Sequence, residues 1–464
     1  MTTPQQYDAI VIGSGQGGNP LSIAMAKAGM RTALVERKHV GGTCINEGCT
    51  PTKTMVASGR VAYLARRAAD YGVRTGPVSI DLEKVRQRKR DIVDRFRNAG
   101  QAGIEKTQNL ELIFGEASFR DNKTIAIRSR EGTDRMISAP RIFINAGTRA
   151  SRPKLDGLDS VPTLDNVSIM ELASVPDHLV ILGGGYIGLE FGQLFRRFGS
   201  RVTIIQSTSQ LLPREDPDVA EEIAKILRED GIEILLNAKA QRAERSDDAI
   251  RLTIQTDKNS TSTVGSQLLL ATGRVPNSDS LNLPAASIKT DDRGFIQVNE
   301  RLETNVEGIY ALGDIKGGPA FTHISYDDFR ILRANLLENR SASTRNRQVP
   351  YCLFMDPQLG RIGLTETEAR AQGRAIRVAK LPMTSVARAL EVDETRGFMK
   401  AVVDAQSNLI LGAAVLGIEG GEVMSVLETA IMGKLPYTAL RDATYAHPTL
   451  AESLNNLFMA MDSA

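Results

Sequence analysis

Two segments of the chain share one pattern of hydrophobic and polar positions. Residues 7–36, YDAIVIGSGQGGNPLSIAMAKAGMRTALVE, and residues 177–206, DHLVILGGGYIGLEFGQLFRRFGSRVTIIQ, each begin with a short apolar run. Each run leads into a glycine turn, then a stretch with apolar residues at helical spacing, and then a β-branched apolar run. A pattern repeated over this length is typical of a duplicated structural unit. We therefore predict two strand–turn–helix–strand units and an α/β fold.

The turn in each copy carries three glycines at the spacing G-x-G-x-x-G. The first glycine permits a tight turn, the second lets the backbone approach a pyrophosphate, and the third lets the helix pack closely on the strand. The pyrophosphate then lies at the amino-terminal end of the helix. Two complete copies predict two dinucleotide sites. The candidate cofactor-binding glycines are Gly13, Gly15, Gly18, Gly183, Gly185 and Gly188.

The residue that ends each second apolar run distinguishes the two sites. Counting 18 residues past Gly18 reaches Glu36, and the same count past Gly188 reaches Gln206. A carboxylate at this position binds a ribose 2′-hydroxyl and repels a 2′-phosphate, whereas a neutral amide admits both. We therefore predict that the second site has a relaxed preference and accepts NADPH, although no arginine follows directly in QSTSQ.

Further apolar runs also end in small residues. RIFINAG ends at Gly147, LLLATG at Gly273, and GIYALGD at Gly313 and Asp314. Such ends suit a backbone packed against a bound ligand, although a plain left-handed turn also explains a glycine there. After a polar segment at residues 341–350, the pattern changes to long runs joined by a turn, followed by helical stretches. We predict an antiparallel α+β domain for this C-terminal part.

Composition and charge narrow the class of protein. The chain has 464 residues, of which 42% are apolar and 24% charged, so about two to four globular domains are expected. The formal net charge is +2, and the basic residues are spread along the chain, which argues against a nucleic-acid partner. The basic run at residues 83–97 has a stripe of apolar side chains and is interpreted as a solvated helix face. No apolar window suits a membrane span and no signal peptide is evident, so we expect a cytoplasmic protein with no membrane partner.

Two of the three cysteines lie in one glycine-rich segment, GGTCINEGCTPTK, at residues 41–53. In a reducing compartment such a pair is catalytic or metal-binding more often than structural. Cys49 precedes a helical segment whose amino-terminal N–H groups favour a thiolate, and Lys53 adds positive charge one turn later. We place Cys44 in the preceding loop, where a substrate has freer approach. A zinc site is disfavoured because the pair offers two ligands and no second Cys/His pair follows nearby.

Thiol exchange also needs a base, and the chain has four histidines. His39 and His178 are interpreted as structural or exposed. His447 is followed by Pro448 and later by Glu452, and histidine is the residue type best suited to proton transfer near neutral pH. Glu452 has a second interpretation, since Thr449-x-x-Glu452 also reads as a helix capping box. Both roles can coexist.

Together these motifs resemble those of the pyridine nucleotide-disulfide oxidoreductases, dimeric flavoenzymes that include dihydrolipoamide, glutathione and mercuric reductases. The resemblance rests on the paired glycine turns, GGTCINEGCTPTK, LLLATGRVPN, GIYALGD and YAHPTLAESL, and covers essentially the whole chain. It implies FAD and NAD(P)H as cofactors. It also implies an FAD domain at residues 1–150 and 275–345, an NAD(P) domain at 151–274, and a dimerisation domain at 346–464.

The same resemblance assigns roles at the thiols. Cys49 would face the flavin as a charge-transfer thiolate, and Cys44 would be the interchange thiol. His447, paired with Glu452, would be the acid and base, contributed by the partner subunit of a homodimer whose active sites span the interface.

It assigns roles around the cofactors as well. Lys53 would lie beside the flavin N5 and pair with Glu190, and Tyr186 would cover the nicotinamide pocket. Cys352 matches no redox motif and is interpreted as a core residue. The remaining candidates for cofactor binding are Glu36 at the FAD ribose, Asp314 at its ribitol chain, and Gly42, Thr43, Gly147, Gly273 and Gln206.

Departures from the better-known members favour a small oxidant as the substrate. Mercuric reductases usually carry a second, C-terminal cysteine pair and lack the His–Glu couple, whereas this chain has no cysteine after Cys352. Dihydrolipoamide dehydrogenases usually have histidine at the position of Tyr445 and an acidic residue at that of Gln206. The segments FTHISYDDFRI and TRGFMKAVVD resemble bacterial flavoproteins that defend against reactive chlorine species and hypothiocyanous acid. We predict reduction of a hypothiocyanite-type oxidant by Cys44, with mercuric ion, or dihydrolipoamide and other low-molecular-weight disulfides, as alternatives.

Overall fold

The structure, a computed structural model, describes residues 3–129, 134–257 and 259–461. The chain packs as two compact units. The first comprises Met1–Thr54, Glu83–Ser151 and Gly273–Arg347, and the second comprises Met55–Leu82, Arg152–Thr272 and Gln348–Ala464. Helix α3, Cys49–Arg66, begins in the first unit and continues into the second. Residues 55–82 thus lie outside the first unit, although the expected FAD domain included them; the three-domain division stays a prediction.

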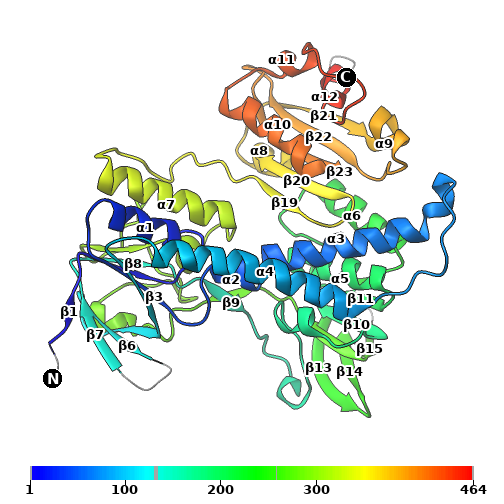
Figure 1. The fold of residues 1–464 in the computed structure, drawn as a ribbon. Helices are drawn as coiled ribbons and strands as arrows, with labels where there is room; N and C mark the ends of the chain where they lie inside the picture. The colour runs from blue at the N-terminus through cyan, green and yellow to red at the C-terminus, as the bar shows by residue number, and fades with distance from the viewer. Residues whose placement is uncertain (1–2, 130–133, 258, 462–464) are drawn as a thin grey trace. The chain divides into compact units, whose positions relative to one another are not determined.

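The first unit is built on a five-stranded sheet in the order β18-β8-β2-β3-β4, in which every neighbouring pair is parallel. Figure 1 labels β8 and β3 of this sheet. All residues of β2 and β3 are buried, as expected for a parallel sheet covered on both faces. Helix α1, Gly18–Lys27, packs on these strands through Leu21 and Met25. The strands are β2 (Ala9–Ile12), β3 (Thr32–Glu36), β4 (Leu110–Phe114), β8 (Arg141–Ile144) and β18 (Ile309–Ala311).

Smaller elements complete the first unit. A second sheet has the order β1-β7-β6-β5, and β9 pairs with β17. Its helices include the short α2, the long α4 and α7, which packs beside α1. The bounds are α2 (Gly42–Asn46), α4 (Leu82–Glu105), α7 (Thr322–Leu337), β1 (Gln5–Gln6), β5 (Glu116–Phe119), β6 (Thr124–Arg128), β7 (Asp134–Ser138), β9 (Thr148–Ala150) and β17 (Arg274–Pro276).

The second unit contains another parallel sheet, in the order β12-β11-β10-β16. Helix α5, Tyr186–Phe198, connects β10 to β11 as α1 connects β2 to β3, which confirms the predicted duplication. An antiparallel sheet, β13-β14-β15, follows in the chain. The bounds are β10 (His178–Leu182), β11 (Arg201–Ile205), α6 (Pro217–Glu229), β12 (Glu233–Leu235), β13 (Lys239–Ser246), β14 (Ala249–Gln255), β15 (Ser260–Gly265) and β16 (Gln267–Leu270).

The C-terminal part of the second unit is a five-stranded antiparallel sheet in the order β19-β20-β23-β22-β21. Helix α10 packs on β20 and β23. Two parallel sheets and this antiparallel sheet confirm the predicted α/β class with an α+β C-terminal part. The bounds are β19 (Tyr351–Leu353), β20 (Gln358–Gly363), α8 (Glu366–Ala371), β21 (Ile376–Pro382), α9 (Ala387–Glu391), β22 (Phe398–Asp404), β23 (Ile410–Gly417), α10 (Gly420–Met432), α11 (Tyr437–Arg441) and α12 (Ser453–Met459).

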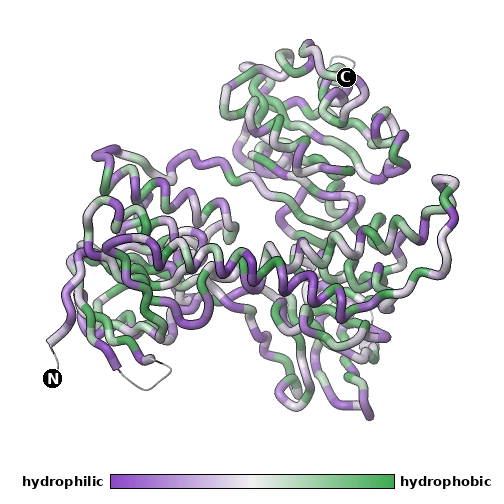
Figure 2. The backbone as a smooth tube through the Cα atoms, in the orientation of Figure 1, coloured by the Kyte–Doolittle hydropathy of each residue, from purple (hydrophilic) through white to green (hydrophobic). Residues whose placement is uncertain are grey.

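Helix α4 carries the basic run, and Figure 2 colours much of it as hydrophilic. Val93 on the expected apolar stripe is buried, but Phe96 is 54% exposed and Lys89 is buried instead. The buried stripe is therefore narrower than predicted, and a lysine side chain forms part of it. Among the described residues, none of the helices is both long and apolar enough to cross a membrane.

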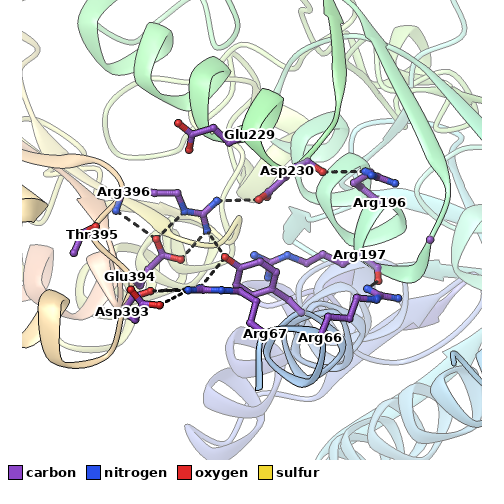
Figure 3. A pocket seen from close by; sticks show the side chains of 12 residues that line it. Arg66, Arg67, Arg196, Arg197, Glu229, Asp230, Asp393, Glu394, Thr395 and Arg396 are labelled. Atoms are coloured by element: carbon purple, nitrogen blue, oxygen red, sulfur yellow. Dashed lines mark hydrogen bonds and ion pairs between the residues drawn. The ribbon is translucent and has the colours of Figure 1, made fainter. Parts of the chain in front are cut away.

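The last turn of α3 lines a pocket of about 600 Å³ in the second unit, together with residues that end α5 and α6 (Figure 3). Tyr63 lies among three guanidinium groups there. Arg197 is 4.1 Å from the centre of its ring, while Arg67 and Arg396 donate hydrogen bonds to its hydroxyl. Arg396 also pairs with Asp230 at the end of α6. The helix that begins at Cys49 is thus held at its far end by charge-assisted contacts.

Candidate functional site

The first glycine turn is shaped by two close backbone approaches. Gly13 has φ +98°, and a Cβ there would lie 2.3 Å from the Asn145 carbonyl oxygen. A Cβ on Gly18 would lie 2.1 Å from the Gly13 carbonyl oxygen. Since both distances are far below van der Waals contact, any side chain would push α1 away from β2 and open the turn. The turn therefore keeps the close helix–strand packing that a pyrophosphate-binding glycine turn requires.

The second turn repeats this geometry. Gly183 has φ +110°, its Cβ would lie 2.3 Å from the Ala271 carbonyl oxygen, and a Cβ on Gly188 would lie 2.1 Å from the Gly183 carbonyl oxygen. Helix α5 begins directly after Gly185, so its amino-terminal N–H groups face the turn. The second copy therefore has the same geometry for a pyrophosphate as the first.

Glu36 and Gln206 occupy equivalent places at the ends of β3 and β11. Oε2 of Glu36 accepts hydrogen bonds from the Ser14 backbone N–H at 3.0 Å and the Ser14 hydroxyl at 2.6 Å. Oε1 of Gln206 accepts from the Gly184 N–H at 2.8 Å, and its Nε2 donates to the Thr208 hydroxyl at 2.6 Å. Both side chains brace their own glycine turn, but only Glu36 brings a carboxylate, as expected from the sequence.

Asn145, at the end of β8, is a residue that the motif analysis did not identify. Its Oδ1 accepts from the Gly18 N–H at 2.9 Å, and its Nδ2 donates to the Leu312 carbonyl at 2.9 Å. It therefore links the start of α1 to the segment that carries Asp314. Oδ2 of Asp314 accepts from the Thr148 hydroxyl at 3.0 Å. The only sequence signal for Asn145 was its place in RIFINAG, next to the predicted Gly147.

The segment that carries the cysteines is helical rather than a loop at Cys44. Gly41, with φ +104°, is the N-cap of the short helix α2, which contains Cys44. A Cβ on Gly42 would lie 2.7 Å from Gly15 Cα, so α2 packs directly against the first glycine turn. The prediction of a loop at Cys44 was wrong, because the left-handed glycine lets the chain enter a helical turn immediately.

The two thiols differ in exposure. Cys49 is exposed, whereas Cys44 is partly buried. The freer approach of a substrate to Cys44 stays a prediction. Cys49 is the first residue of α3, in agreement with its predicted place at a helix amino terminus.

The proton distribution between the thiols favours an anionic Cys49. The hydrogen bond between Cys44 and Cys49 raises the pKa of Cys44 well above its ordinary value, and burial and the nearby Cys49 charge raise it further. Thr322 and Lys53 act in the opposite direction and lower it. The Cys49 sulfur lies 3.1 Å from the Thr322 hydroxyl oxygen, a contact that sequence reasoning missed. A pair that holds its proton on Cys44 leaves Cys49 as the thiolate.

Two further candidates lie on α5. Oε1 of Glu190 accepts from the Phe354 backbone N–H at 2.9 Å, and the residue is buried. Tyr186, the first residue of the helix, packs edge-to-face on Tyr351 with ring centres 5.5 Å apart. The Tyr351 hydroxyl in turn donates to the buried Glu215. The Lys53–Glu190 pair and the cover over the nicotinamide stay predictions.

His447 and Glu452 form a couple in the second unit. Nδ1 of His447 lies 2.9 Å from Oε2 and 3.1 Å from Oε1 of Glu452. An ionised carboxylate only accepts, so Nδ1 carries the proton and Nε2 is left to exchange one. The His447 side chain is 70% exposed. The Thr449 hydroxyl accepts from the Glu452 N–H at 3.2 Å, as in a cap, but the Glu452 carboxylate is directed to His447.

Other candidates are accounted for by packing. Cys352 lies on β19, with its sulfur 3.7 Å from Oε1 of Gln358. His178 is buried, and its ring nitrogens contact the Val264 carbonyl and the Thr203 hydroxyl. Within the described part of the chain, no group of three or more His, Cys, Asp or Glu side chains lies close enough together to hold a metal ion.

Comparison with known proteins covers nearly the whole chain. Residues 7–328 match the family model "Pyridine nucleotide-disulphide oxidoreductase", and residues 349–458 match its dimerisation domain. The probable pyridine nucleotide-disulfide oxidoreductase RclA of Escherichia coli K12 is 39% identical, over 98% of this chain and 99% of that protein. A mercuric reductase of Bacillus cereus is 34% identical, over 98% of this chain and 72% of its own length.

Two further matches agree with these. A dihydrolipoyl dehydrogenase of Geobacillus stearothermophilus is 30% identical, over 96% of this chain and 94% of its own length. The solved structure of the HOCl-induced flavoprotein disulfide reductase RclA from Escherichia coli has a TM-score of 0.89 at 38% identity, covering 98% of this chain and 99% of that one. The chain therefore belongs to the pyridine nucleotide-disulphide oxidoreductases, flavin-dependent enzymes that use FAD and NAD(P)H.

Proposed function

We propose that this enzyme takes electrons from NAD(P)H and delivers them, through a Cys44–Cys49 redox pair, to a small oxidant of the hypothiocyanite type. The observation that carries this proposal is the pair itself. Cys49 is the first residue of α3, and its hydrogen bond with Cys44 keeps the shared proton on the Cys44 sulfur. Bound FAD supplies the two-electron chemistry that reduces the Cys44–Cys49 disulfide. We also propose that the enzyme works in the cytoplasm, where disulfides are kept reduced.

We propose that each of the two glycine turns binds one cofactor. We assign FAD to the first turn, with Glu36 at its ribose and Asp314 at its ribitol chain, and NAD(P)H to the second, with Tyr186 over the nicotinamide. Lys53 and Glu190 would act as a pair beside the flavin. The further residues assigned to cofactor binding are Gly13, Gly15, Gly18, Gly42, Thr43, Gly147, Gly183, Gly185, Gly188, Gln206 and Gly273.

The substrate step can be written with Cys44 as the attacking sulfur. Cys44 gives up its proton and attacks the sulfur of HOSCN, a Cys44–S–SCN adduct forms, and the departing oxygen leaves as water. The Cys49 thiolate then attacks Cys44, which forms the disulfide and releases SCN⁻. The oxidant gains two electrons and the two thiols lose two. The raised pKa of Cys44 makes a proton acceptor necessary, and we assign that role to Nε2 of His447.

The cysteines of this chain and its relatives support a small oxidant as the substrate. A small electrophile needs an accessible nucleophile and a proton donor more than a binding pocket. Residues 353–464 contain no cysteine pair that could pass a soft metal inward. RclA of Escherichia coli, which is 39% identical, is an HOCl-induced flavoprotein disulfide reductase, whereas the mercuric reductase is 34% identical. Mercuric ion and dihydrolipoamide-type disulfides remain the alternatives.

The substrate assignment is tested by the rate at which the reduced enzyme is reoxidised. In stopped-flow mixing, hypothiocyanous acid is expected to react with a larger second-order rate constant than oxidised lipoamide, glutathione disulfide or thiol-bound mercuric ion. The reason is that the small oxidant must only reach one sulfur. If any of the other three reacts faster, the substrate proposal is wrong and only the family-level function stands.

The nicotinamide preference gives a second prediction. The side-chain oxygen of Gln206 accepts a hydrogen bond from the Gly184 N–H. Because this side chain is an amide and not a carboxylate, it places no negative charge next to a 2′-phosphate. NADPH and NADH are therefore both expected to reduce the enzyme efficiently. In a Gln206→Glu variant, NADPH should lose efficiency relative to NADH. Comparison of kcat/KM for the two nucleotides checks this, and a hundredfold preference of the parent enzyme for NADH would contradict it.

A further inference from the structure

The second unit contains a fully buried carboxylate, Glu215, in the segment between β11 and α6. Its Oε1 accepts a hydrogen bond from the Tyr351 hydroxyl, and its Oε2 accepts one from Nε of Arg361 at 3.2 Å. The Arg361 side chain is also buried, and its Nη1 donates to the backbone carbonyls of Ile362 and Ala413 at 2.7 Å and 3.0 Å. A buried charge is costly unless it is paired and hydrogen-bonded, so these contacts give the Glu215 carboxylate one fixed place.

The contacts of Glu215 join the antiparallel sheet to the second glycine turn. Tyr351 on β19 and Arg361 on β20 are directly paired across the two strands, so their side chains lie on the same face of the sheet. The Glu215 backbone N–H donates to the Leu212 carbonyl at 2.9 Å, and the Leu212 N–H donates to the Gly184 carbonyl at 3.0 Å. Glu215 is therefore fixed relative to the turn that we assign to NAD(P)H.

Tyr351 also contacts Tyr186, which begins α5 directly after this turn, with the rings edge-to-face and their centres 5.5 Å apart. Burial raises the pKa of Tyr186, and a hydrogen bond with Tyr351 acts in the opposite direction. Burial and the charge of Glu215 raise the pKa of Tyr351, so Tyr351 keeps its proton. A tyrosine hydroxyl has one proton to donate, and that of Tyr351 goes to Glu215. The Tyr186 hydroxyl therefore donates to the Tyr351 oxygen.

We propose that Tyr351, held by Glu215 and Arg361, is a positioning residue that fixes the ring of Tyr186 for binding of the nicotinamide. This role rests on the proposed assignment of Tyr186 over the nicotinamide. Tyr186 is only partly buried, so packing alone leaves its side chain some freedom. The ring contact and the chain of hydrogen bonds that ends on Glu215 remove that freedom before the nucleotide arrives. A ring that is already ordered lowers the entropic cost of binding.

The test compares a nucleotide that has the nicotinamide with one that lacks it, on the flavin-loaded enzyme. Tyr351→Phe keeps the ring and removes the hydroxyl that links Tyr186 to Glu215. The apparent Kd of NADPH, taken from the concentration dependence of flavin reduction in stopped flow, is expected to rise about tenfold, as for the loss of one hydrogen bond. The inhibition constant of ADP-ribose, which has no nicotinamide, should stay unchanged. Tyr437→Phe, which removes another tyrosine hydroxyl from the second unit, should change neither constant.

A double-mutant cycle tests the chain of hydrogen bonds itself. Tyr186→Phe should weaken NADPH binding as much as Tyr351→Phe does, because either change separates the Tyr186 ring from Glu215. The double variant should bind NADPH no more weakly than each single variant. Additive effects of the two changes would mean that the hydroxyls act independently, and would refute the proposed role of Tyr351.

The outcomes separate this inference from the proposed function. If NADPH does not reduce the flavin of the parent enzyme, the proposed function fails and this inference fails with it. If Tyr186→Ala weakens NADPH binding while Tyr351→Phe does not, the role of Tyr351 is refuted and the assignment of Tyr186 stands. If Tyr186→Ala has no effect, that assignment and this inference are both wrong. An equal loss of ADP-ribose affinity in Tyr351→Phe would also overturn the inference, because the change would then act on the glycine turn.

Discussion

Replacing Cys44 with serine is expected to abolish substrate turnover and to leave a stable thiolate at Cys49. The attacking sulfur is lost, so no substrate adduct and no disulfide can form, and turnover should fall by about three orders of magnitude or more. Cys49 keeps its place at the start of α3 and its contact with Thr322. Its thiolate should therefore give a charge-transfer band with oxidised flavin near neutral pH, measured by absorbance spectroscopy.

The matched controls are serine replacements of the other two cysteines. Cys49→Ser should also stop turnover but show no charge-transfer band, because no sulfur then remains at the start of α3, the position assigned to the flavin-facing thiolate. Cys352→Ser should behave like the parent enzyme, since its sulfur contacts Gln358 on β20. A band in Cys49→Ser that is missing from Cys44→Ser would reverse the roles of the two thiols.

The sequence predicted the parts of this fold that depend on local spacing. Both glycine turns could be found because each places three glycines, an apolar strand and a helix within one continuous segment of the chain. The carboxylate of Glu36 and the amide of Gln206 followed from counting, and each contacts its own turn. The couple of His447 and Glu452 was implied by the resemblance to the family rather than by spacing, and the two side chains do contact each other.

The remaining features of the site depend on contacts that no local pattern records. Thr322 is 273 positions from Cys49, and Asn145 is 127 positions from Gly18. A threonine at a helix start and an asparagine at a strand end are common, so neither stands out in one sequence. The helical turn at Cys44 was missed for a similar reason, because the packing of α2 against Gly15 is a contact between separate segments.

Replacement of the exposed His447 is expected to have the second large effect on activity. His447→Ala is expected to slow the reaction of the reduced thiols with oxidant by about 10²- to 10⁴-fold, because the Cys44 proton then has no acceptor and the leaving oxygen no donor. Reduction of the enzyme by NAD(P)H should change little. Stopped-flow measurement of each half-reaction separates the two effects. Glu452→Gln, which keeps the shape but weakens the hold on Nδ1, should slow the same half-reaction to a smaller extent. Equal loss in both half-reactions would remove His447 from this role.

Mixed dimers test whether that histidine serves the partner subunit. The chain carries the dimerisation domain of its family at residues 349–458, and we propose a homodimer in which His447 of one protomer acts on Cys44 of the other. Consider a heterodimer of one Cys44→Ser chain and one His447→Ala chain. If each site joins residues of both chains, one of its two sites keeps both groups intact, and about half of the parent activity should return. If each site lies within one chain, both sites lack a required group and the heterodimer should be as impaired as the separate variants. Purification through two different affinity tags isolates the heterodimer, and its steady-state rate against that of each parent homodimer decides between the two architectures.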